Sequence, residues 1–335
     1  MDQTTTRRQA LAGAAGVAAA LSLAGTAAAS PEQSRADERK ARETAARMSL
    51  EEKLGQLFVV EVYGQSADTV HPRNRELYGV DTPAEVIAKY RPGAVIYFDA
   101  RRGPDNVRNP RQIAQLSNGL QRASRIPLII SVDQEGGSVV YRLVEPATQL
   151  PGNMALGAAR STADTFASAR VIGIELAAVG INQNYAPVSD VNINPANPVI
   201  GVRSFGADPQ LCARMVGEAV RGYHRGDVAS AAKHFPGHGD TDTDSHTGLP
   251  VITHSRAELD RIDLPPFREA IKRGVDTIMT AHIVVPALDA TGVPATMSRP
   301  IITGLLREEL GFDGLIVTDA LDMRGASEDF PPDVA

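Results

Sequence analysis

LLREELGFDGLIVTD, residues 305–319, contains one complete helix–strand unit. Its first half has the apolar spacing of a helix, and Gly311 stands where a glycine commonly ends a helix. Residues 315–318 lack polar alternation, which is typical of a short strand buried on both faces of a parallel sheet. Asp319 follows at once, so the sequence predicts a carboxylate at the carboxyl end of a buried strand.

The same pattern occurs six more times before this unit, with stretches of helical length and period between the apolar runs. Three helix starts carry a capping-box pattern: Ser49 with Glu52, Thr82 with Glu85, and Ser255 with Glu258. The six runs are residues 57–63, 94–98, 127–132, 181–187, 230–234 and 277–283. Repeated strand–helix units indicate an α/β fold, a parallel sheet covered by helices.

A closed barrel and an open doubly wound sheet both fit this repeat. Polar residues cluster just after the carboxyl ends of many different runs, which is where a (β/α)₈ TIM-type barrel builds its active site, and this favours the barrel. Only seven strands are found, and the 335 − 319 = 16 residues after Asp319 are too few for a helix, a strand and a final helix. We therefore expect the C-terminal end of the barrel, with its eighth strand and helix, to be missing; an overlooked strand is the alternative.

Composition excludes several function classes. A formal charge of −6 with interspersed signs argues against a nucleic-acid partner or an anionic membrane surface. A single cysteine, Cys212, cannot form an internal disulfide. We expect it in the interior of a helix, with its side chain in the protein core.

The first 29 residues have the pattern of a twin-arginine signal peptide. Arg7 and Arg8 precede an apolar stretch over 10–25 that is too short for a membrane span, and small residues stand before Ser30. We expect export out of the cytoplasm with cleavage after residue 29 and no stable membrane insertion afterwards; an uncleaved anchor is the alternative. Residues 30–47 are expected to form a helical lead-in or a solvated linker before the main domain at 48–335.

The segment KHFPGHGDTDTDSH, residues 233–246, holds three histidines and three aspartates. His234 and His238 have helical spacing, but the proline and glycine between them prevent a regular helix, and no common zinc pattern is present, so no metal site is predicted. Asp244 and His246 are two positions apart and would share one face of an extended segment. A carboxylate there can orient the imidazole as a proton donor and acceptor; a solvated polar loop is the alternative.

Two carboxylates follow apolar runs directly. Asp133 precedes a Gly-Gly pair and is suited to binding paired sugar hydroxyls through charge-assisted hydrogen bonds. Asp319 is suited to attack on an anomeric carbon. The alternatives are a plain turn at the glycines and an aspartate that caps the turn after the last strand.

Taken together these segments resemble a known family. Residues 305–323 are similar to the nucleophile signature of family 3 glycoside hydrolases, and residues 233–246 resemble the Lys-His-Phe-Pro-Gly-His-Gly…Asp-Ser-His loop of the family's β-N-acetylglucosaminidase branch. Residues 186–192, 202–206 and 279–282 also match. The resemblance runs from about Met48 to Gly325, and it assigns 48–335 to the family's catalytic barrel.

The resemblance implies retaining hydrolysis of terminal β-linked N-acetylglucosamine from cell-wall or chitin-type glycans, without a metal or an organic cofactor. Asp319 is the implied nucleophile, and His246 is the implied acid/base, oriented by Asp244. The residues implied to hold the hydroxyls of the terminal sugar are Asp133, Arg203, Lys233 and His234.

One position departs from the family pattern. Family members commonly have an arginine directly after Gly-Gly and a second one three positions later, whereas this chain has Ser138 and Tyr141 there, with Arg142 one position further on. Three alternatives stay open: a β-glucosidase or β-xylosidase of the same family, phosphorolysis in place of hydrolysis, and a non-catalytic carbohydrate-binding fragment.

Overall fold

The structure is a computed structural model that describes residues 31–246 and 248–327. The chain divides into two compact units, residues 1–49 and 50–335. In the first unit residues 31–47, expected as a helix or a linker, form helix α2 (Pro31–Arg47). The predicted signal peptide, residues 1–29, lies outside the described residues. No helix among the described residues has the length and apolar character needed to span a bilayer.

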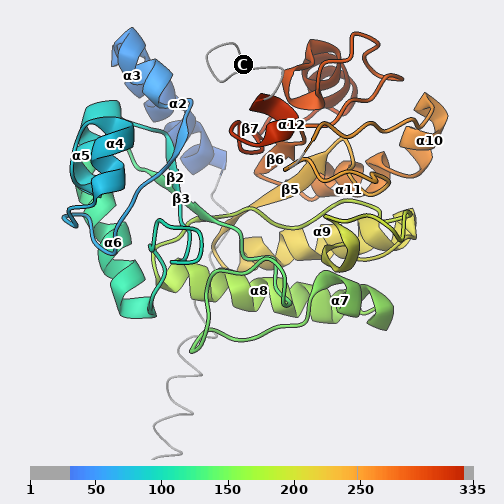
Figure 1. Ribbon diagram of the computed structural model, residues 1–335, viewed down its shortest axis with the longest axis horizontal. Helices are drawn as coiled ribbons and strands as arrows, with labels where there is room; N and C mark the ends of the chain where they lie inside the picture. The colour runs from blue at the N-terminus through green and yellow to red at the C-terminus, as the bar shows by residue number, and fades with distance from the viewer. Residues whose placement is uncertain (1–30, 247, 328–335) are drawn as a thin grey trace, which may run out of the picture. The chain divides into compact units, whose positions relative to one another are not determined.

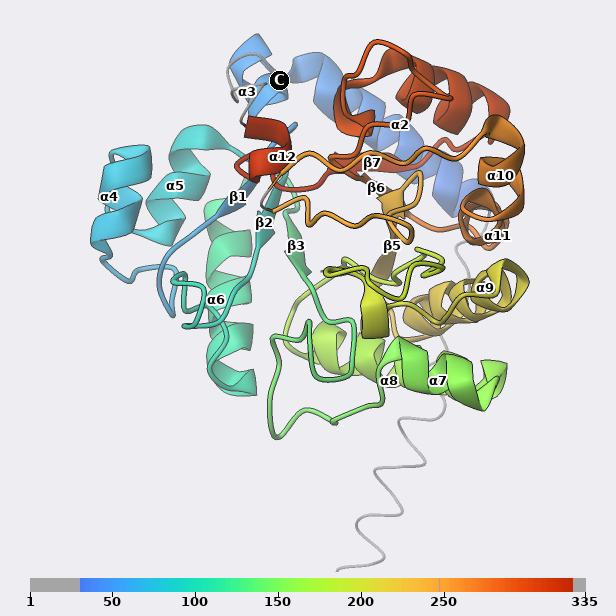
Figure 2. The ribbon, with the colours of Figure 1, turned by 45° about the vertical axis from the view of Figure 1, so that its right-hand side comes forward.

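The second unit is built on a parallel sheet of seven strands that pair in chain order, and Figures 1 and 2 show that this sheet is curled. The strands are β1 (Val59–Glu61), β2 (Ala94–Ile96), β3 (Ile129–Val132), β4 (Gln183–Asn184), β5 (Ala229–Phe235), β6 (Thr277–Thr280) and β7 (Leu315–Thr318). Each strand overlaps one predicted apolar run, so the prediction of an α/β fold with seven parallel strands is confirmed. In the described part of the chain, β1 and β7 are the two ends of the row.

Helices lie on the outer side of the curled sheet, as the ribbon views show (Figures 1 and 2). The helices of this unit are α3 (Leu50–Gly55), α4 (Pro72–Tyr78), α5 (Pro83–Tyr90), α6 (Pro110–Ala123), α7 (Asn153–Ala159), α8 (Thr162–Ala178), α9 (Pro209–Arg225), α10 (Arg256–Arg261), α11 (Leu264–Lys272), the π-helix η3 (Pro300–Glu309) and α12 (Arg324–Ser327), with short 3₁₀ turns η1 (Gly201–Arg203) and η2 (Ala295–Met297). The turn η1 and helix α12 belong to the connections that follow the carboxyl ends of β4 and β7. Of the three predicted capping boxes, those at the start of α5 and of α10 are formed.

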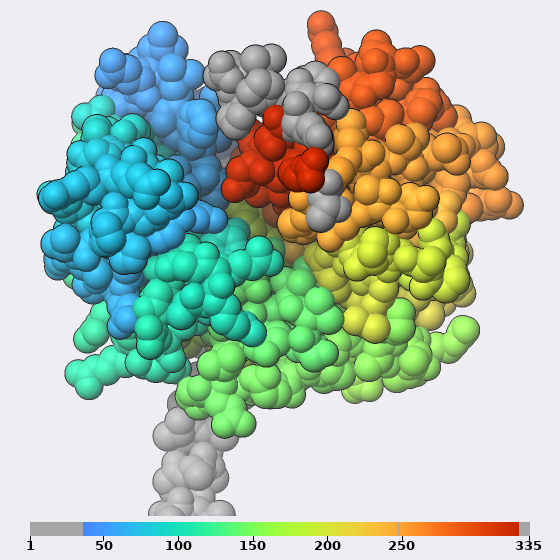
Figure 3. All heavy atoms as spheres, viewed as in Figure 1, coloured from blue at the N-terminus to red at the C-terminus, as the bar shows by residue number. Residues whose placement is uncertain are grey.

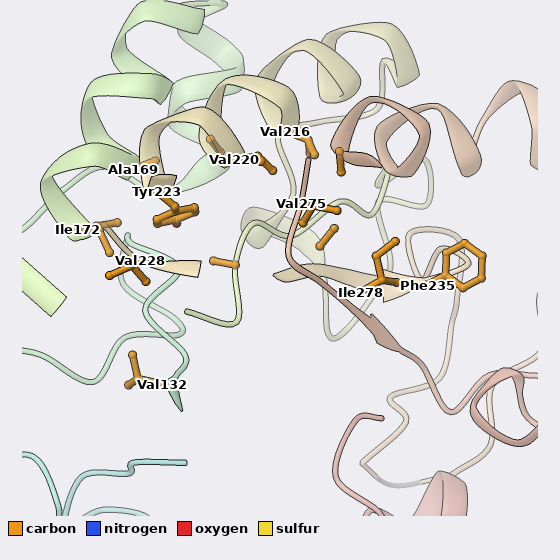
Figure 4. Packing of buried hydrophobic residues seen from close by; sticks show 14 of the residues in the cluster. Val132, Ala169, Ile172, Val216, Val220, Tyr223, Val228, Phe235, Val275 and Ile278 are labelled. Atoms are coloured by element: carbon orange, nitrogen blue, oxygen red, sulfur yellow. The ribbon is translucent and has the colours of Figure 1, made fainter. Parts of the chain in front are cut away.

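The core lies between the sheet and this helical layer. Buried side chains of α8 and α9, such as Ile172 and Val220, belong to the same hydrophobic cluster as the strand residues Phe235 and Ile278 (Figure 4). The two helices approach closely, because a Cβ at Gly222 of α9 would come within 2.5 Å of the Phe166 carbonyl oxygen of α8. Cys212 is buried in α9, where burial raises its pKa to about 12 and keeps it a thiol. The prediction of a core cysteine is confirmed.

A charge pair at the amino ends of β5 and β6 should make stability depend on pH. His224 Nε2 lies 2.8 Å from Asp276 Oδ2, which also accepts a hydrogen bond from the Ser230 N–H. Asp276 raises the pKa of His224. For Asp276, burial alone would raise the pKa, but His224 and Ser230 hold it below its ordinary value. The pair therefore stabilises the fold between the unfolded-state values of about 4 and 6.5.

We expect His224→Gln, which keeps a neutral donor, to lower the free energy of unfolding by up to about 1 kcal/mol near pH 5.5, because the pair is partly exposed. The difference should vanish as the pH rises through the folded-state pKa of His224, since the wild-type ring is then neutral as well. Urea unfolding of both proteins at pH 5.5 and 9 measures this. An equal difference at the two pH values would show that the charge contributes nothing.

Candidate active site

Every predicted site residue lies at or just after the carboxyl end of a strand. Asp133 follows β3, Lys233 and His234 are in the last part of β5, and Asp319 follows β7. Arg203 ends the turn η1 in the connection after β4, and the Asp244–His246 segment belongs to the connection after β5. Because the strands are parallel, these residues all come to the same edge of the sheet.

A buried cluster of four charges forms the floor of this edge. Lys233 Nζ lies 2.7 Å from Asp133 Oδ1 and 2.8 Å from Glu135 Oε1. Arg203 makes a bidentate pair with Glu135, at 2.9 and 2.7 Å. The side chains of Lys233 and Glu135 are only 3% and 2% exposed. Burial opposes the charge of Glu135, but Lys233 and Arg203 outweigh it and lower its pKa to about 2. Glu135 is therefore held as a carboxylate between the two cationic side chains.

His234 is held beside this cluster by a buried aspartate. Its Nδ1 lies 2.7 Å from Asp190 Oδ2, and its Nε2 lies 3.4 Å from Nη2 of Arg203. Asp190 Oδ1 also accepts hydrogen bonds from the backbone N–H groups of His234 and His238. Burial alone would raise the pKa of Asp190, but His234 and these contacts hold it below its ordinary value. The ionised Asp190 carboxylate therefore accepts from His234 Nδ1 and fixes the orientation of the ring.

Asp319 is positioned by the strand that precedes it. Its backbone N–H donates to the Thr280 carbonyl at 2.9 Å, and its Oδ1 accepts the Ala320 N–H at 2.8 Å. Burial alone would raise the pKa of Asp319, but His234, the Ala320 N–H and His282 together lower it. The carboxylate is therefore ionised at neutral pH, as a nucleophile requires.

Asp244 and His246 form a hydrogen-bonded pair, but not on an extended segment as predicted. Asp244 Oδ1 accepts both the His246 backbone N–H, at 2.9 Å, and a contact from its Nδ1, at 2.8 Å. The extended geometry was wrong because an aspartate readily accepts from a backbone N–H two residues on and so closes a turn. The His246 side chain is 49% exposed. The ring is thus oriented by Asp244 and accessible to a ligand.

Arg142 occupies the place where the sequence departs from the family pattern. Its side chain is buried, its guanidinium stacks on Phe98 at 5.2 Å, and its Nη2 lies 3.7 Å from Asp133 Oδ2. Its Nε is buried without a hydrogen-bond partner in the described residues. Tyr141 instead packs against Arg101. The arginine one position further on therefore reaches the charged cluster.

Three residues of this edge were not predicted: Glu135, Asp190 and His238. Asp190 and His238 belong to segments that resemble the family, and Glu135 stands two residues after Asp133, yet nothing in the local pattern shows that these side chains are buried and paired. Within the described residues no group of three or more histidine, cysteine, aspartate or glutamate side chains has the arrangement of a metal site.

A family model described as "Glycosyl hydrolase family 3 N terminal domain" matches residues 49–333. The chain belongs to glycoside hydrolase family 3. The resemblance seen in the sequence is thereby confirmed. This family 3 chain is 47% identical to a β-hexosaminidase A from Pseudoalteromonas piscicida, over 74% of its own length and 44% of the relative.

Solved structures of family members agree with this assignment. A family 3 β-N-acetylglucosaminidase from Paenibacillus superposes with a TM-score of 0.77 at 48% identity, covering 84% of this chain and 51% of that one. A β-glucoside phosphorylase gives a TM-score of 0.76 at 30% identity, covering 88% of this chain and 50% of that one. The family 3 chain therefore spans about half the length of these relatives.

Proposed function

We propose that this chain carries the catalytic centre of a retaining β-N-acetylhexosaminidase that removes terminal β-linked N-acetylglucosamine from cell-wall or chitin-type glycans. The observation that carries the proposal is the Asp244–His246 pair, in which a carboxylate holds an accessible imidazole at 2.8 Å. It lies on the same edge of the sheet as the ionised Asp319. The relatives named β-hexosaminidase and β-N-acetylglucosaminidase support this choice of sugar.

In the first step Asp319 attacks the anomeric carbon of the terminal sugar, and the bond from that carbon to the leaving oxygen breaks. His246 gives its proton to the leaving oxygen, and a covalent glycosyl–aspartate forms. In the second step His246 takes a proton from water as the water oxygen attacks the same carbon. Asp319 then leaves as a carboxylate, and two inversions return the sugar with its original configuration.

The charged cluster supplies the sugar-binding groups in this proposal. Asp133 belongs to the cluster and His234 lies beside it, so a carboxylate and an imidazole can exchange hydrogen bonds with paired hydroxyls. Lys233 and Arg203 add charged donors that are already fixed by Glu135, so little side-chain freedom is lost on binding. No metal ion or organic cofactor is needed for these steps.

We further propose that the seven strands belong to a (β/α)₈ TIM-type barrel, with an eighth strand between β7 and β1. The exposed apolar side chains of Phe58 and Leu315, at these two ends of the row, support such a neighbour. Residues 48–335 would form the catalytic barrel, 30–47 its lead-in, and 1–29 a twin-arginine signal peptide for export. The proposed partner is a carbohydrate, not a nucleic acid.

The substrate assignment predicts a clear preference between two aryl glycosides. The purified chain should release p-nitrophenol from the β-N-acetylglucosaminide with a kcat/KM at least about 100-fold above that for the β-glucoside. The glucoside lacks the acetamido group, so polar groups of the site that bind this group would be left unpaired, which costs several kcal/mol. Continuous absorbance assays of both substrates measure the ratio. A preference for the β-glucoside would indicate a β-glucosidase instead. A preference for the β-xyloside, assayed in the same way, would indicate a β-xylosidase.

Phosphorolysis is the second candidate, and the superposition on a β-glucoside phosphorylase favours testing it. A histidine acid/base that is neutral in the second step does not repel phosphate, as a carboxylate would. Turnover that rises with phosphate concentration and yields a sugar 1-phosphate would establish it. Hydrolysis at an unchanged rate without phosphate would exclude it.

A further inference from the structure

Ser245, which lies between Asp244 and the proposed acid/base His246, is buried, whereas its two neighbours are partly exposed. Asp244 and His246 are partly exposed, whereas Ser245 is only 3% exposed. The bonds between Asp244 and His246 fix the ring within its own turn, but they do not fix the turn relative to Asp319. The contacts of Ser245 reach into the protein.

Ser245 binds a buried histidine at the carboxyl end of β5. Its Oγ lies 3.1 Å from His238 Nε2, and His238 Nδ1 lies 2.6 Å from Thr241 Oγ1. His238 and Thr241 are both buried, and Asp190 accepts the backbone N–H of His238. The ring therefore stands between the beginning of the turn segment, at Thr241, and its last part, at Ser245.

The hydrogen-bond directions in this chain are determined by what each group can donate. The Thr241 hydroxyl donates to the His238 carbonyl, so its oxygen accepts from Nδ1–H. Nε2 is then an acceptor, and Ser245 donates to it. Burial and the nearby His234 lower the pKa of His238 to about 4, which keeps the ring in this neutral form. An alanine at 245 would leave Nε2 without its donor.

The backbone of Ser245 also contacts the segment that carries the proposed nucleophile. The Ser245 carbonyl accepts the N–H of Gly325, in α12, at 3.0 Å. A Cβ at Gly325 would meet the carbonyl oxygens of Ser245 and Gly248, each at 2.8 Å, so only glycine permits this approach. Earlier in the same segment, His282 Nε2 contacts the Ala320 carbonyl at 2.9 Å. Figure 3 shows this segment, coloured red, beside the orange residues that follow β5 and β6.

We propose that Ser245, held by His238, is a positioning residue that sets the Asp244–His246 turn against the segment following Asp319. The inference rests on the proposed function of His246 and Asp319. It assigns Ser245 no contact with the substrate. Its side chain anchors the turn to His238, three residues after β5, and its carbonyl anchors the turn to α12, so Ser245 links the proton donor to the segment that follows the nucleophile.

The test compares leaving groups that need protonation with those that do not. Ser245→Ala is expected to lower kcat/KM for a phenyl β-N-acetylglucosaminide by about 10- to 100-fold, because misplacing a general acid forfeits much of its contribution. For the 2,4-dinitrophenyl glycoside, which leaves without a proton, the loss should stay below about threefold. His238→Ala should give the same pattern, and the double variant should lose no more than the larger single loss.

Thr243→Val is the matched control, because it removes a hydroxyl from the same loop whose hydrogen bond goes to the exposed Asp242. It should change neither substrate's kcat/KM. An equal loss for both leaving groups in Ser245→Ala, or no loss at all, would overturn the inference while leaving the proposed function intact.

Hydrogen exchange separates the two proposals further, because it needs no activity. Peptides containing Ser245 and Gly325 should exchange faster in Ser245→Ala than in the wild type, and Thr243→Val should match the wild type. A wild-type chain inactive on all N-acetylglucosaminides would refute the proposed function. Unchanged hydrogen exchange of these peptides in Ser245→Ala would refute the positioning role of Ser245, whatever the activity.

Discussion

Replacing Asp319 with asparagine is expected to lower kcat for an aryl β-N-acetylglucosaminide by on the order of 10⁴–10⁶, the range seen when a covalent catalyst or its base is removed. Asparagine keeps the size of the side chain and an acceptor for the Ala320 N–H, so the fold around it should persist. What it loses is the ionised oxygen that forms the bond to the anomeric carbon. Steady-state kinetics with a melting curve for each protein measures both effects.

Asp322→Asn is the matched control for this prediction. It makes the same chemical change three residues further on, at an exposed side chain, and should retain nearly wild-type activity. Azide that takes the place of the missing carboxylate in Asp319→Asn should give the α-glycosyl azide, because only one inversion occurs at the anomeric carbon, whereas azide rescue of an acid/base variant should give the β-azide. An Asp319→Asn protein that keeps more than about one per cent of kcat would place the nucleophile elsewhere.

The strands and their order could be predicted because the sequence encodes them locally. A strand buried on both faces must be apolar at successive positions, and LIVT at 315–318 has this pattern. The predicted burial of this strand was wrong, because β7 stands at one end of the described row, where Leu315 is exposed and the other residues are partly buried. Parallel pairing then places the residue after each run at one edge of the sheet. This is why Asp133 and Asp319 could be placed at one edge before any coordinates were known, whereas Lys233 was assigned to the site by the resemblance to the family.

The partners within the site could not be predicted in the same way. Lys233 and Asp133 are 100 residues apart in the chain, and their contact depends on the curvature of a sheet in which they do not share neighbouring strands. Glu135 has no local sign of burial, since it stands between a polar residue and two glycines. Asp244 and His246 were paired correctly by their spacing, but the turn that joins them is a side-chain effect that a two-residue periodicity does not describe.

The buried cluster leads to the largest expected effect on stability. Glu135→Gln should lower the free energy of unfolding by about 3–5 kcal/mol, because it leaves Lys233 and Arg203 facing a single carboxylate in a buried site. Glutamine keeps the size of the side chain, so the loss measures charge more than packing. Urea unfolding midpoints, compared at constant m, give the difference.

Two further proteins make this result specific to the cluster. Glu218→Gln changes a surface ion pair with Arg221 and should cost less than about 1 kcal/mol. Arg203→Gln added to Glu135→Gln removes the excess positive charge and should recover part of the lost stability, because the two side chains contact each other directly. A Glu135→Gln protein no less stable than Glu218→Gln would mean that water reaches the cluster.

The contribution of Glu135 to stability should depend on pH in a definite direction. The pKa of Glu135 is lowered to about 2, so its contribution is fully present above the unfolded-state value and is lost only as the pH falls through the folded one. The difference between wild type and Glu135→Gln should therefore be constant from about pH 5 to 8 and shrink below about pH 4. Because Arg203 and Lys233 are fixed by the same carboxylate, Glu135→Gln should also raise KM for the sugar. The Glu135 carboxylate would thus order Lys233 and Arg203 for sugar binding without contacting the sugar itself.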